Sequence, residues 1–125
     1  MKHLIIIFAV TLLLITTCYA EEPRTVGIYK RHMQADKQQK KDFDHILHHM
    51  LYLSGISDGY TTINKQRKAD KQKLLYCQPD TEILHGADYM RILEEALNRP
   101  DTPIVDQLTI AEAMLLALQA EFPCK

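Results

Sequence analysis

The densest group of side chains able to do chemistry lies in the segment KDFDHILHHM. It consists of Asp42, Asp44, His45, His48 and His49. On a helix, His45 and His49 lie one turn apart, and Asp44 and His48 have the same spacing, so either pair could contribute two ligands to a divalent metal. A stable zinc site needs three or four ligands, and the segment has neither an H-E-x-x-H motif nor a nearby cysteine. Solvated helix surface is the favoured interpretation, and we predict no metal and no cofactor.

The sequence also contains no convincing set of side chains for hydrolysis. Carboxylates that could act as a pair occur later in the chain, at Glu94, Glu95, Asp101 and Asp106. Nothing in the sequence places two of them across a cleft. The chain also lacks a G-x-S-x-G motif for a serine nucleophile and a glycine-rich loop for a phosphate. We therefore predict a binding protein and not an enzyme.

The first 20 residues have the pattern of a signal peptide. Lys2 and His3 precede an apolar run at residues 4–15, which contains one polar residue, Thr11. The run Cys18-Tyr19-Ala20 then offers small residues where a signal peptidase reads them. The apolar run is too short for a comfortable transmembrane anchor. Cys18 could instead be lipidated, but Thr17 is a poor residue immediately before such a cysteine. We predict a signal peptide at residues 1–20, no membrane attachment after its removal, and a single helical domain at residues 21–125.

Removal of the signal peptide leaves two cysteines, Cys77 and Cys124, in an oxidising compartment. We predict a disulfide between them, which would close a loop of 47 positions and contribute about 3 to 4 kcal/mol to stability. The two cysteines are far apart in the sequence and form no C-x-x-C motif. A redox-active pair is therefore not indicated.

Charge is unevenly distributed along the mature chain. Its 14 Lys and Arg against 16 Asp and Glu argue against a nucleic-acid binder. Residues 24–73 hold eleven basic and five acidic residues, whereas residues 80–122 hold nine acidic and two basic residues. This asymmetry indicates two faces of opposite sign or oppositely charged surfaces that meet between subunits. The plain alternative is that the basic segment is a solvated loop.

Residues 64–73, NKQRKADKQK, are the most basic part of the chain. They are expected to be exposed, either as a solvated connector or as part of a surface that meets an acidic partner. The connector is the favoured interpretation. If the run does contact a partner, the candidate residues are Arg67, Lys68 and Lys71.

The sequence LTIAEAMLLALQAEFPC predicts the central helix of the core. Thr109 and Glu112 have the spacing of a capping box, so the helix should begin at Ile110. The residues that follow are apolar on every side, as expected of a helix that is buried all round. Pro123 should end the helix.

Two further helices are expected upstream, joined by a turn at residues 78–81. One covers about residues 36–62, where a stripe of helical spacing is formed by Phe43, Ile46, Leu47, Met50, Leu53 and Tyr60. The other covers residues 84–98, with a buried stripe of Ala87, Met90, Leu93 and Leu97. Residues 21–39 show little periodicity and predict a loosely held arm, into which Val26, Ile28 and Met33 could dock. The predicted fold class is all-α, a small bundle of three main helices plus short helical turns, stapled by one disulfide.

Gly55 and Gly59 fall inside the first of these helices. They are four residues apart and therefore share a face, where they would let another backbone approach closely. The alternative is that one of them ends the helix as a C-cap. Close packing is favoured, because Ile56 and Tyr60 continue the apolar stripe.

Three motifs follow one another along the mature chain. They are Y-L-S-G-I-S-D-G at residues 52–59, C-Q-P at residues 77–79, and a final run from Ala113 through Ala117 and Leu118 to Phe122-Pro123-Cys124. Together they resemble the type VI amidase immunity (Tai-like) family of periplasmic proteins, over about residues 43–124. The chain departs from that pattern at residues 85–88, where His-Gly-Ala-Asp replaces a Thr cap followed by Gln-Leu.

This resemblance implies a helical, often homodimeric protein of the periplasm. It would bind a peptidoglycan-cleaving amidase effector delivered by a type VI secretion system, and a protruding loop or helix would plug the enzyme's cleft. Cys77 and Cys124 match the cysteines of the family, whereas its partner-contacting residues do not carry over. A secreted helical binding or chaperone-like module with another protein partner is the alternative.

Overall fold

The computed structural model describes residues 24–38 and 43–124. Over these residues the fold is all-helical, as predicted, with α2 (Val26–Gln38), α3 (Phe43–Ala69), α4 (Gly86–Asn98) and α5 (Ile110–Glu121). The only strand-like pairing in this part of the chain is an isolated bridge between Thr25 and Thr109. None of the helices described is long and apolar enough to cross a membrane. The signal peptide predicted at residues 1–20 lies outside the described residues.

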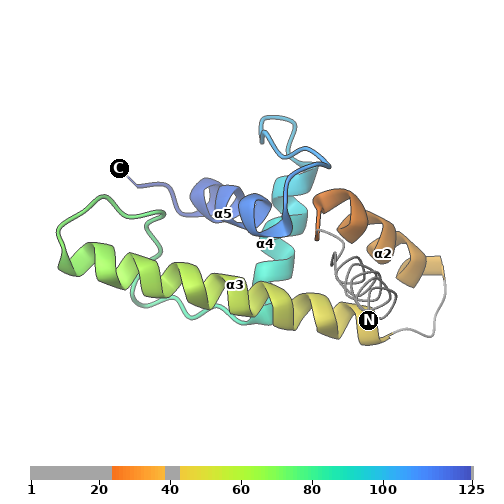
Figure 1. Ribbon diagram of the computed structural model, residues 1–125, viewed down its shortest axis with the longest axis horizontal. Coiled ribbons are helices and arrows are strands. Elements are labelled where there is room, and N and C mark those ends of the chain that lie inside the picture. Colours follow the sequence, from red (N-terminus) through yellow and green to blue (C-terminus); the bar gives the residue numbers. More distant parts are fainter. Residues whose placement is uncertain (1–23, 39–42, 125) are drawn as a thin grey trace, which may run out of the picture.

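The long helix α3 forms one side of the molecule, and α2, α4 and α5 all lie on the other side of it (Figure 1). Helix α4 packs against both α3 and α5, and α2 packs against α3 and α5. The hydrophobic core therefore lies between α3 and the three shorter helices.

Helix α5 is the central core helix and begins at Ile110, as predicted. In its capping box, the backbone N–H of Glu112 donates to Thr109 Oγ1 at 3.2 Å, and the Thr109 N–H donates to Glu112 Oε2 at 2.9 Å. The buried residues of the helix are Ile110, Ala113, Met114, Ala117 and Leu118. Leu115 and Leu116 are only half-buried, so the helix buries one broad face and is not buried all round.

The loosely held arm predicted for residues 21–39 is wrong for most of its length, because residues 26–38 form α2. Val26 and Tyr29 are buried, at 1% and 2% exposure, and Met33 packs against the core. The helix is also joined to the start of α5, since the Val26 N–H donates to the Leu108 carbonyl at 2.9 Å. Tertiary contacts therefore order a segment whose own periodicity is weak.

Burial of Tyr29 makes the stability of the protein sensitive to alkaline pH. The loss of hydration on burial, together with the nearby Glu94 carboxylate, raises the pKa of the Tyr29 phenol above its ordinary value. The stabilisation from the neutral phenol is therefore complete below the unfolded pKa of about 10 and is lost as pH rises above it. Urea denaturation midpoints should fall between pH 9 and pH 11, and they should fall less in Tyr29→Phe. An equal fall in both proteins would contradict this assignment.

Helix α3 begins and ends about seven residues later than predicted, at Phe43 and Ala69 rather than near residues 36 and 62. The first part of the basic run is therefore helix and not connector. Lys71, just beyond the helix, has a φ of 55° in the left-handed region, and the Gln72 N–H donates to the Arg67 carbonyl at 2.8 Å. The connector between the two predicted helices consequently begins only at residue 70.

Helix α4 begins at Gly86, two residues later than predicted, and ends at Asn98 as predicted. The His85 N–H donates to the carboxylate of Asp88 at 2.9 Å, which stabilises the first turn. The buried residues of the helix are Tyr89, Met90, Ile92, Leu93 and Ala96. Of the predicted stripe, Met90 and Leu93 are buried, Leu97 is half-buried and Ala87 is exposed.

Neither prediction for Gly55 and Gly59 holds within the described chain. Both glycines are exposed, and α3 continues past them to Ala69. Apart from its chain neighbours and the backbone of its own helix, an added Cβ at either would meet no described atom within 4 Å. Close approach occurs instead at Gly86, the first residue of α4. A Cβ there would lie 3.0 Å from Ser54 Oγ and 3.4 Å from Met50 Cβ, so the absence of a side chain lets α4 begin against α3.

The side chain of Ser57 on α3 is fully buried, and its hydroxyl has no hydrogen-bond partner among the described residues. Because a buried hydroxyl without a partner is destabilising, Ser57→Ala is expected to raise the free energy of unfolding by about 1 kcal/mol. Urea denaturation measures this change. The matched control is Ser54→Ala, since the Ser54 hydroxyl donates to the Met50 carbonyl at 2.8 Å. The control should show no gain, and a loss of stability in Ser57→Ala would contradict the expectation.

Candidate binding site

The predicted disulfide is confirmed and fixes one side of the candidate site. Cys77 and Cys124 are joined with a Cα–Cα distance of 5.0 Å across a sequence separation of 47. Beside it, the Cys77 N–H donates to the Phe122 carbonyl at 2.8 Å. The segment that precedes α4 is therefore attached, covalently and by a backbone hydrogen bond, to the chain just after α5.

Side chains from α3 and α5 hold the residues that lead into Cys77. Asn64 uses both ends of its amide, since its Nδ2 donates to the Tyr76 carbonyl at 3.0 Å and its Oδ1 accepts from the Leu75 N–H at 2.7 Å. The buried Tyr76 hydroxyl forms a hydrogen bond with Thr61 Oγ1 at 3.2 Å. Gln119 of α5 donates to the Leu75 carbonyl at 3.1 Å. Two helices and the disulfide thus fix the backbone at residues 75–77.

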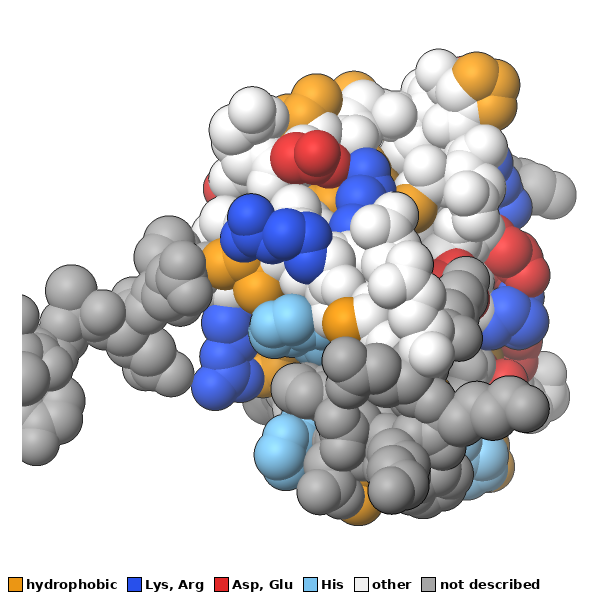
Figure 2. All heavy atoms as spheres, turned by 90° about the vertical axis from the view of Figure 1, so that its right-hand side faces the viewer, with side chains coloured by type: hydrophobic (Ala, Val, Ile, Leu, Met, Phe, Trp, Pro, Cys, Tyr) orange, Lys and Arg blue, Asp and Glu red, His pale blue; other side chains and the backbone are white. Residues whose placement is uncertain are grey.

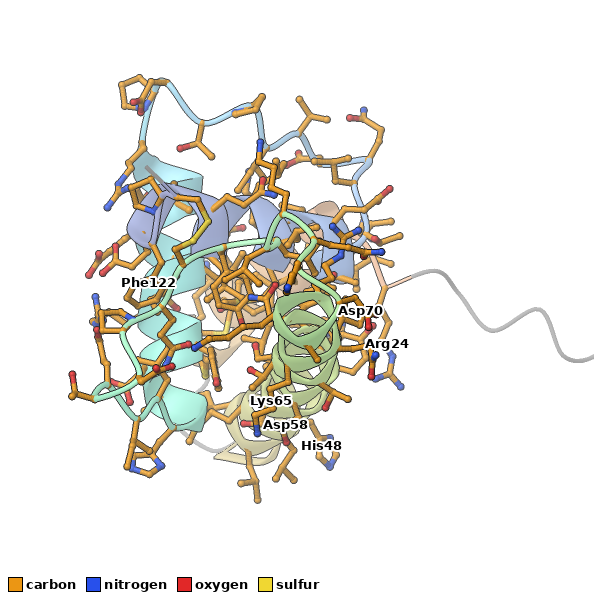
Figure 3. All side chains as sticks on the ribbon, turned by 90° about the vertical axis from the view of Figure 1, so that its left-hand side faces the viewer. Arg24, His48, Asp58, Lys65, Asp70 and Phe122 are labelled. Atoms are coloured by element: carbon orange, nitrogen blue, oxygen red, sulfur yellow. A yellow bond between two sulfur atoms is a disulfide. The ribbon has the colours of Figure 1, made fainter. Side chains whose placement is uncertain are left out.

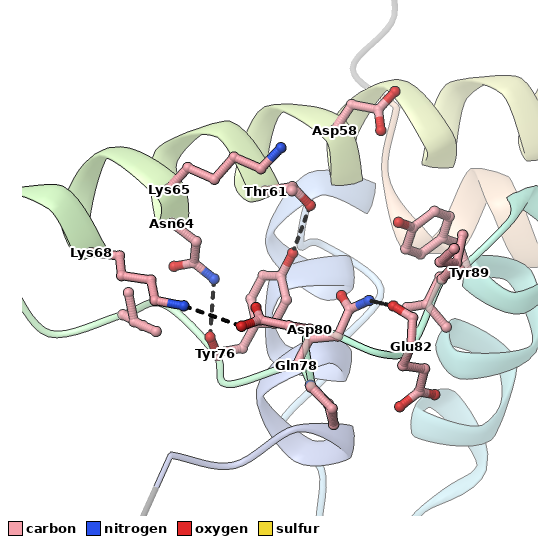
Figure 4. A pocket seen from close by; sticks show the side chains of 14 residues that line it. Asp58, Thr61, Asn64, Lys65, Lys68, Tyr76, Gln78, Asp80, Glu82 and Tyr89 are labelled. Carbon is pink, nitrogen blue, oxygen red and sulfur yellow. Dashed lines mark hydrogen bonds and ion pairs between the residues drawn. The ribbon is translucent and has the colours of Figure 1, made fainter.

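A cleft of about 460 Å³ lies between the second half of α3, residues 74–84 and the start of α4. Lys65 and Lys68 extend from α3 on one side, while Tyr76 and Asp80 lie on the facing segment (Figure 4). Ile83, which also lines the cleft, is 78% exposed. This volume is within the range of about 300–1,000 Å³ found for pockets that bind small molecules. A space of this size can also hold several side chains of a partner protein.

The charged groups of the cleft are only weakly tied to one another. Lys68 Nζ lies 3.4 Å from Asp80 Oδ2, but the two side chains are 68% and 89% exposed, so this pair adds little stability. Lys65 has no hydrogen bond or ion pair with a described residue. A partner could therefore pair with either lysine without disrupting the fold.

Tyr89 of α4 supplies a neutral hydroxyl on the inner side of the cleft. Burial raises the pKa of this phenol, and the nearby Tyr76, Asp58 and Asp88 raise it further. A phenol has an ordinary pKa of about 10 and is neutral at pH 7 in any case, so this hydroxyl can donate or accept a hydrogen bond there. The site combines ammonium, carboxylate and phenol groups with an exposed apolar side chain, an arrangement suited to binding a polypeptide surface.

The three basic candidates from the sequence occupy different places. Arg67 is half-buried and donates to the Lys73 carbonyl at 2.7 Å, so its guanidinium stabilises the chain reversal after α3. Lys68 lines the cleft, whereas Lys71 is exposed beyond the end of the helix. Sequence reasoning did not identify Tyr76 and Tyr89 as cleft residues. The only sequence signal for these two residues was their position, since Tyr76 precedes and Tyr89 follows the turn predicted at residues 78–81.

The carboxylates considered for hydrolysis are engaged separately. Glu94 accepts a hydrogen bond from the Tyr29 hydroxyl at 3.4 Å, and Glu95 pairs with Arg91 at 3.0 Å. Asp106 pairs with Lys30 of α2 at 2.8 Å. Asp101 is exposed in the loop after α4. Glu94, Glu95 and Asp106 therefore contribute to the packing and the surface of the helices.

A second concavity, of about 690 Å³, holds histidines from the segment first considered for metal binding. It is lined in part by His32, His48 and His49, and Figure 2 shows histidines on this face beside Lys and Arg side chains. His49 packs edge-on against Tyr29 with 4.8 Å between ring centroids. In the part of the chain that the structure describes, no three His, Cys, Asp or Glu side chains could hold a metal ion together. Asp42 and the side chains of Asp44 and His45 lie outside the described residues.

No protein-family model matches the chain, and neither a curated protein nor a solved structure matches it. The family resemblance therefore stays a prediction carried by the three quoted motifs.

Proposed function

We propose that the chain is a periplasmic immunity protein that binds a type VI secretion peptidoglycan amidase and blocks its cleft sterically. The observation that carries this proposal is the disulfide between Cys77 and Cys124, which anchors the wall of an open cleft lined by both charged and apolar side chains. Disulfides persist in oxidising compartments, which agrees with the signal peptide predicted at residues 1–20. The two cysteines are also those that the C-Q-P and F-P-C motifs match to the family.

Rigidity of the cleft favours a binding role. Residues 75–77 are held by the disulfide, by Asn64 and by Gln119, so little conformational freedom remains to be lost when a partner binds. Around this fixed backbone, Lys68 and Ile83 are exposed. They offer a partner both charge and apolar surface, the combination from which specific protein interfaces are built.

The direct test uses the purified, disulfide-bonded protein and the amidase encoded beside its gene. Calorimetry should show nanomolar binding, and one equivalent should abolish cleavage of peptidoglycan by the enzyme. No binding to any neighbouring hydrolase would exclude the proposal. A gene neighbourhood without secretion components or hydrolases would favour the alternative, a secreted helical binding or chaperone-like module with another partner.

Reversal of one charge in the cleft tests the site. Lys68→Glu is expected to weaken amidase binding about tenfold, because a lysine that can pair with an acidic partner becomes a repelling carboxylate. Arg31→Glu is the matched control, since Arg31 is exposed on α2 and does not line the cleft. Affinities are compared by calorimetry at one salt concentration. Equal affinities for both variants would place the contact elsewhere on the molecule.

A further inference from the structure

The second concavity has no part in the proposed amidase binding and is larger than the cleft. It measures about 690 Å³, against about 460 Å³ for the cleft, and lies between the first half of α2, the first half of α3 and the start of α5. Figure 3 shows Arg24 and His48, which line it, on the side of α3 turned away from α4. The cleft lies between α3 and α4, so the two hollows are on different sides of α3.

Apolar side chains from three helices line the second concavity. Ile28 comes from α2, Leu51 from α3 and Ile110 from α5. Ile110 is 2% exposed and therefore borders the inner part, whereas Leu51 is 62% exposed and lies toward the opening. An apolar ligand in this space would remove the surface of Leu51 from water, and the hydrophobic effect favours that transfer.

The charged and polar groups of the second concavity suit an anion. Arg24 Cζ lies 4.5 Å from the centroid of the Tyr52 ring, so a cation–π contact orients the guanidinium. A guanidinium binds a carboxylate through two parallel N–H donors. The imidazole of His48, which lines the same space, offers a further N–H donor. No Asp or Glu is among the described residues that line the concavity, so no carboxylate of the described wall would repel an anion.

Contacts between aromatic rings hold the two long walls of the second concavity together. His32 of α2 and His49 of α3 both line it, and their ring centroids are 5.6 Å apart. Behind them, the buried Tyr29 packs edge-on against His49. The space is therefore formed before a ligand enters, as it is in most small-molecule sites, and binding costs little conformational freedom.

We propose that the second concavity binds a small amphiphilic carboxylate, namely a fatty acid of short to medium chain. Its carboxylate would pair with Arg24, and its apolar chain would lie against Leu51 and Ile110. A fatty acid matches the lining in both respects, because it joins one negative charge to an apolar body. The volume of about 690 Å³ is also within the range of about 300–1,000 Å³ found for small-molecule pockets. This inference stands apart from amidase inhibition, since fatty-acid binding is measured without the enzyme.

Calorimetry with octanoate tests the inference on the mature, disulfide-bonded protein. The matched ligands are 1-octanol, which keeps the chain and lacks the charge, and acetate, which keeps the charge and lacks the chain. Octanoate should bind about tenfold more tightly than either, because only octanoate uses both the guanidinium and the apolar wall. In NMR spectra it should shift the amide signals around Tyr52 and leave those around Tyr76 in the cleft unchanged. Octanoate that binds no better than 1-octanol, or that shifts mainly the cleft signals, would overturn the inference.

Two substitutions separate the charged part of the second concavity from its apolar part. Arg24→Gln should weaken octanoate binding about tenfold and leave 1-octanol binding unchanged, because it removes the positive charge alone. Leu51→Gln should weaken the binding of both ligands, since it removes apolar surface. Arg31→Gln is the matched control, because Arg31 is exposed on α2 and does not line the concavity. Circular dichroism confirms that the variants keep their helices, and a folded Arg24→Gln that binds octanoate as tightly as Arg31→Gln does would contradict the proposal.

Discussion

Replacing Cys77 and Cys124 together by serine is expected to lower the free energy of unfolding by about 3 to 4 kcal/mol. The disulfide closes a loop of 47 positions, so its loss restores conformational entropy to the unfolded chain. It also releases the wall of the cleft from the end of α5. For a small domain with a total stability of about 5 to 15 kcal/mol, this is a large share.

Urea denaturation of the oxidised wild type, the reduced wild type and the double serine variant measures the effect. Reduction of the wild type should produce the same loss as the double substitution, and the variant should be insensitive to reductant. A loss below about 1 kcal/mol would show that the unfolded chain gains little freedom when the loop opens.

Leu118→Ala is expected to lower the free energy of unfolding by about 2 to 5 kcal/mol. Leu118 is fully buried near the end of α5, and truncating it removes packed methyl groups and leaves a cavity in the core. The matched control is Leu116→Ala on the same helix, because Leu116 is only half-buried and should cost less. Urea denaturation compares the two. Equal losses would contradict the burial pattern of α5.

The elements that the sequence predicted best are those whose signals are local. The start of α5 was predicted to the residue because Thr109 and Glu112 supply each other's hydrogen bonds within one turn. The end of α3 was missed because it depends on distant groups. Asn64 and Arg67 bond the chain 6 to 12 residues further on, and no periodicity shows such contacts. Helix α2 was missed for the same reason, since burial of Tyr29 depends on α3 and α4.

Only the disulfide of the candidate site could be predicted from the sequence, because that prediction needs no more than the number of cysteines. An even pair of cysteines in a chain predicted to be exported indicated the disulfide, whatever the fold between them. The cleft needs Tyr76, Tyr89 and Lys68 from three separate elements, and their meeting depends on how α4 packs against α3. The basic residues of the run at 64–73 also differ in role. Arg67 donates a hydrogen bond to the backbone, whereas Lys68 faces the cleft.

The tyrosines at the cleft allow the binding of a partner to be followed by the intrinsic fluorescence of the protein. The chain contains six tyrosines and no tryptophan, and Tyr76 and Tyr89 lie on the walls that a partner would touch. Entry of a partner should therefore alter tyrosine emission directly. Tryptophans of the partner could meanwhile be excited selectively, without background from this chain, so both sides of one complex could be followed in the same cuvette without any attached dye.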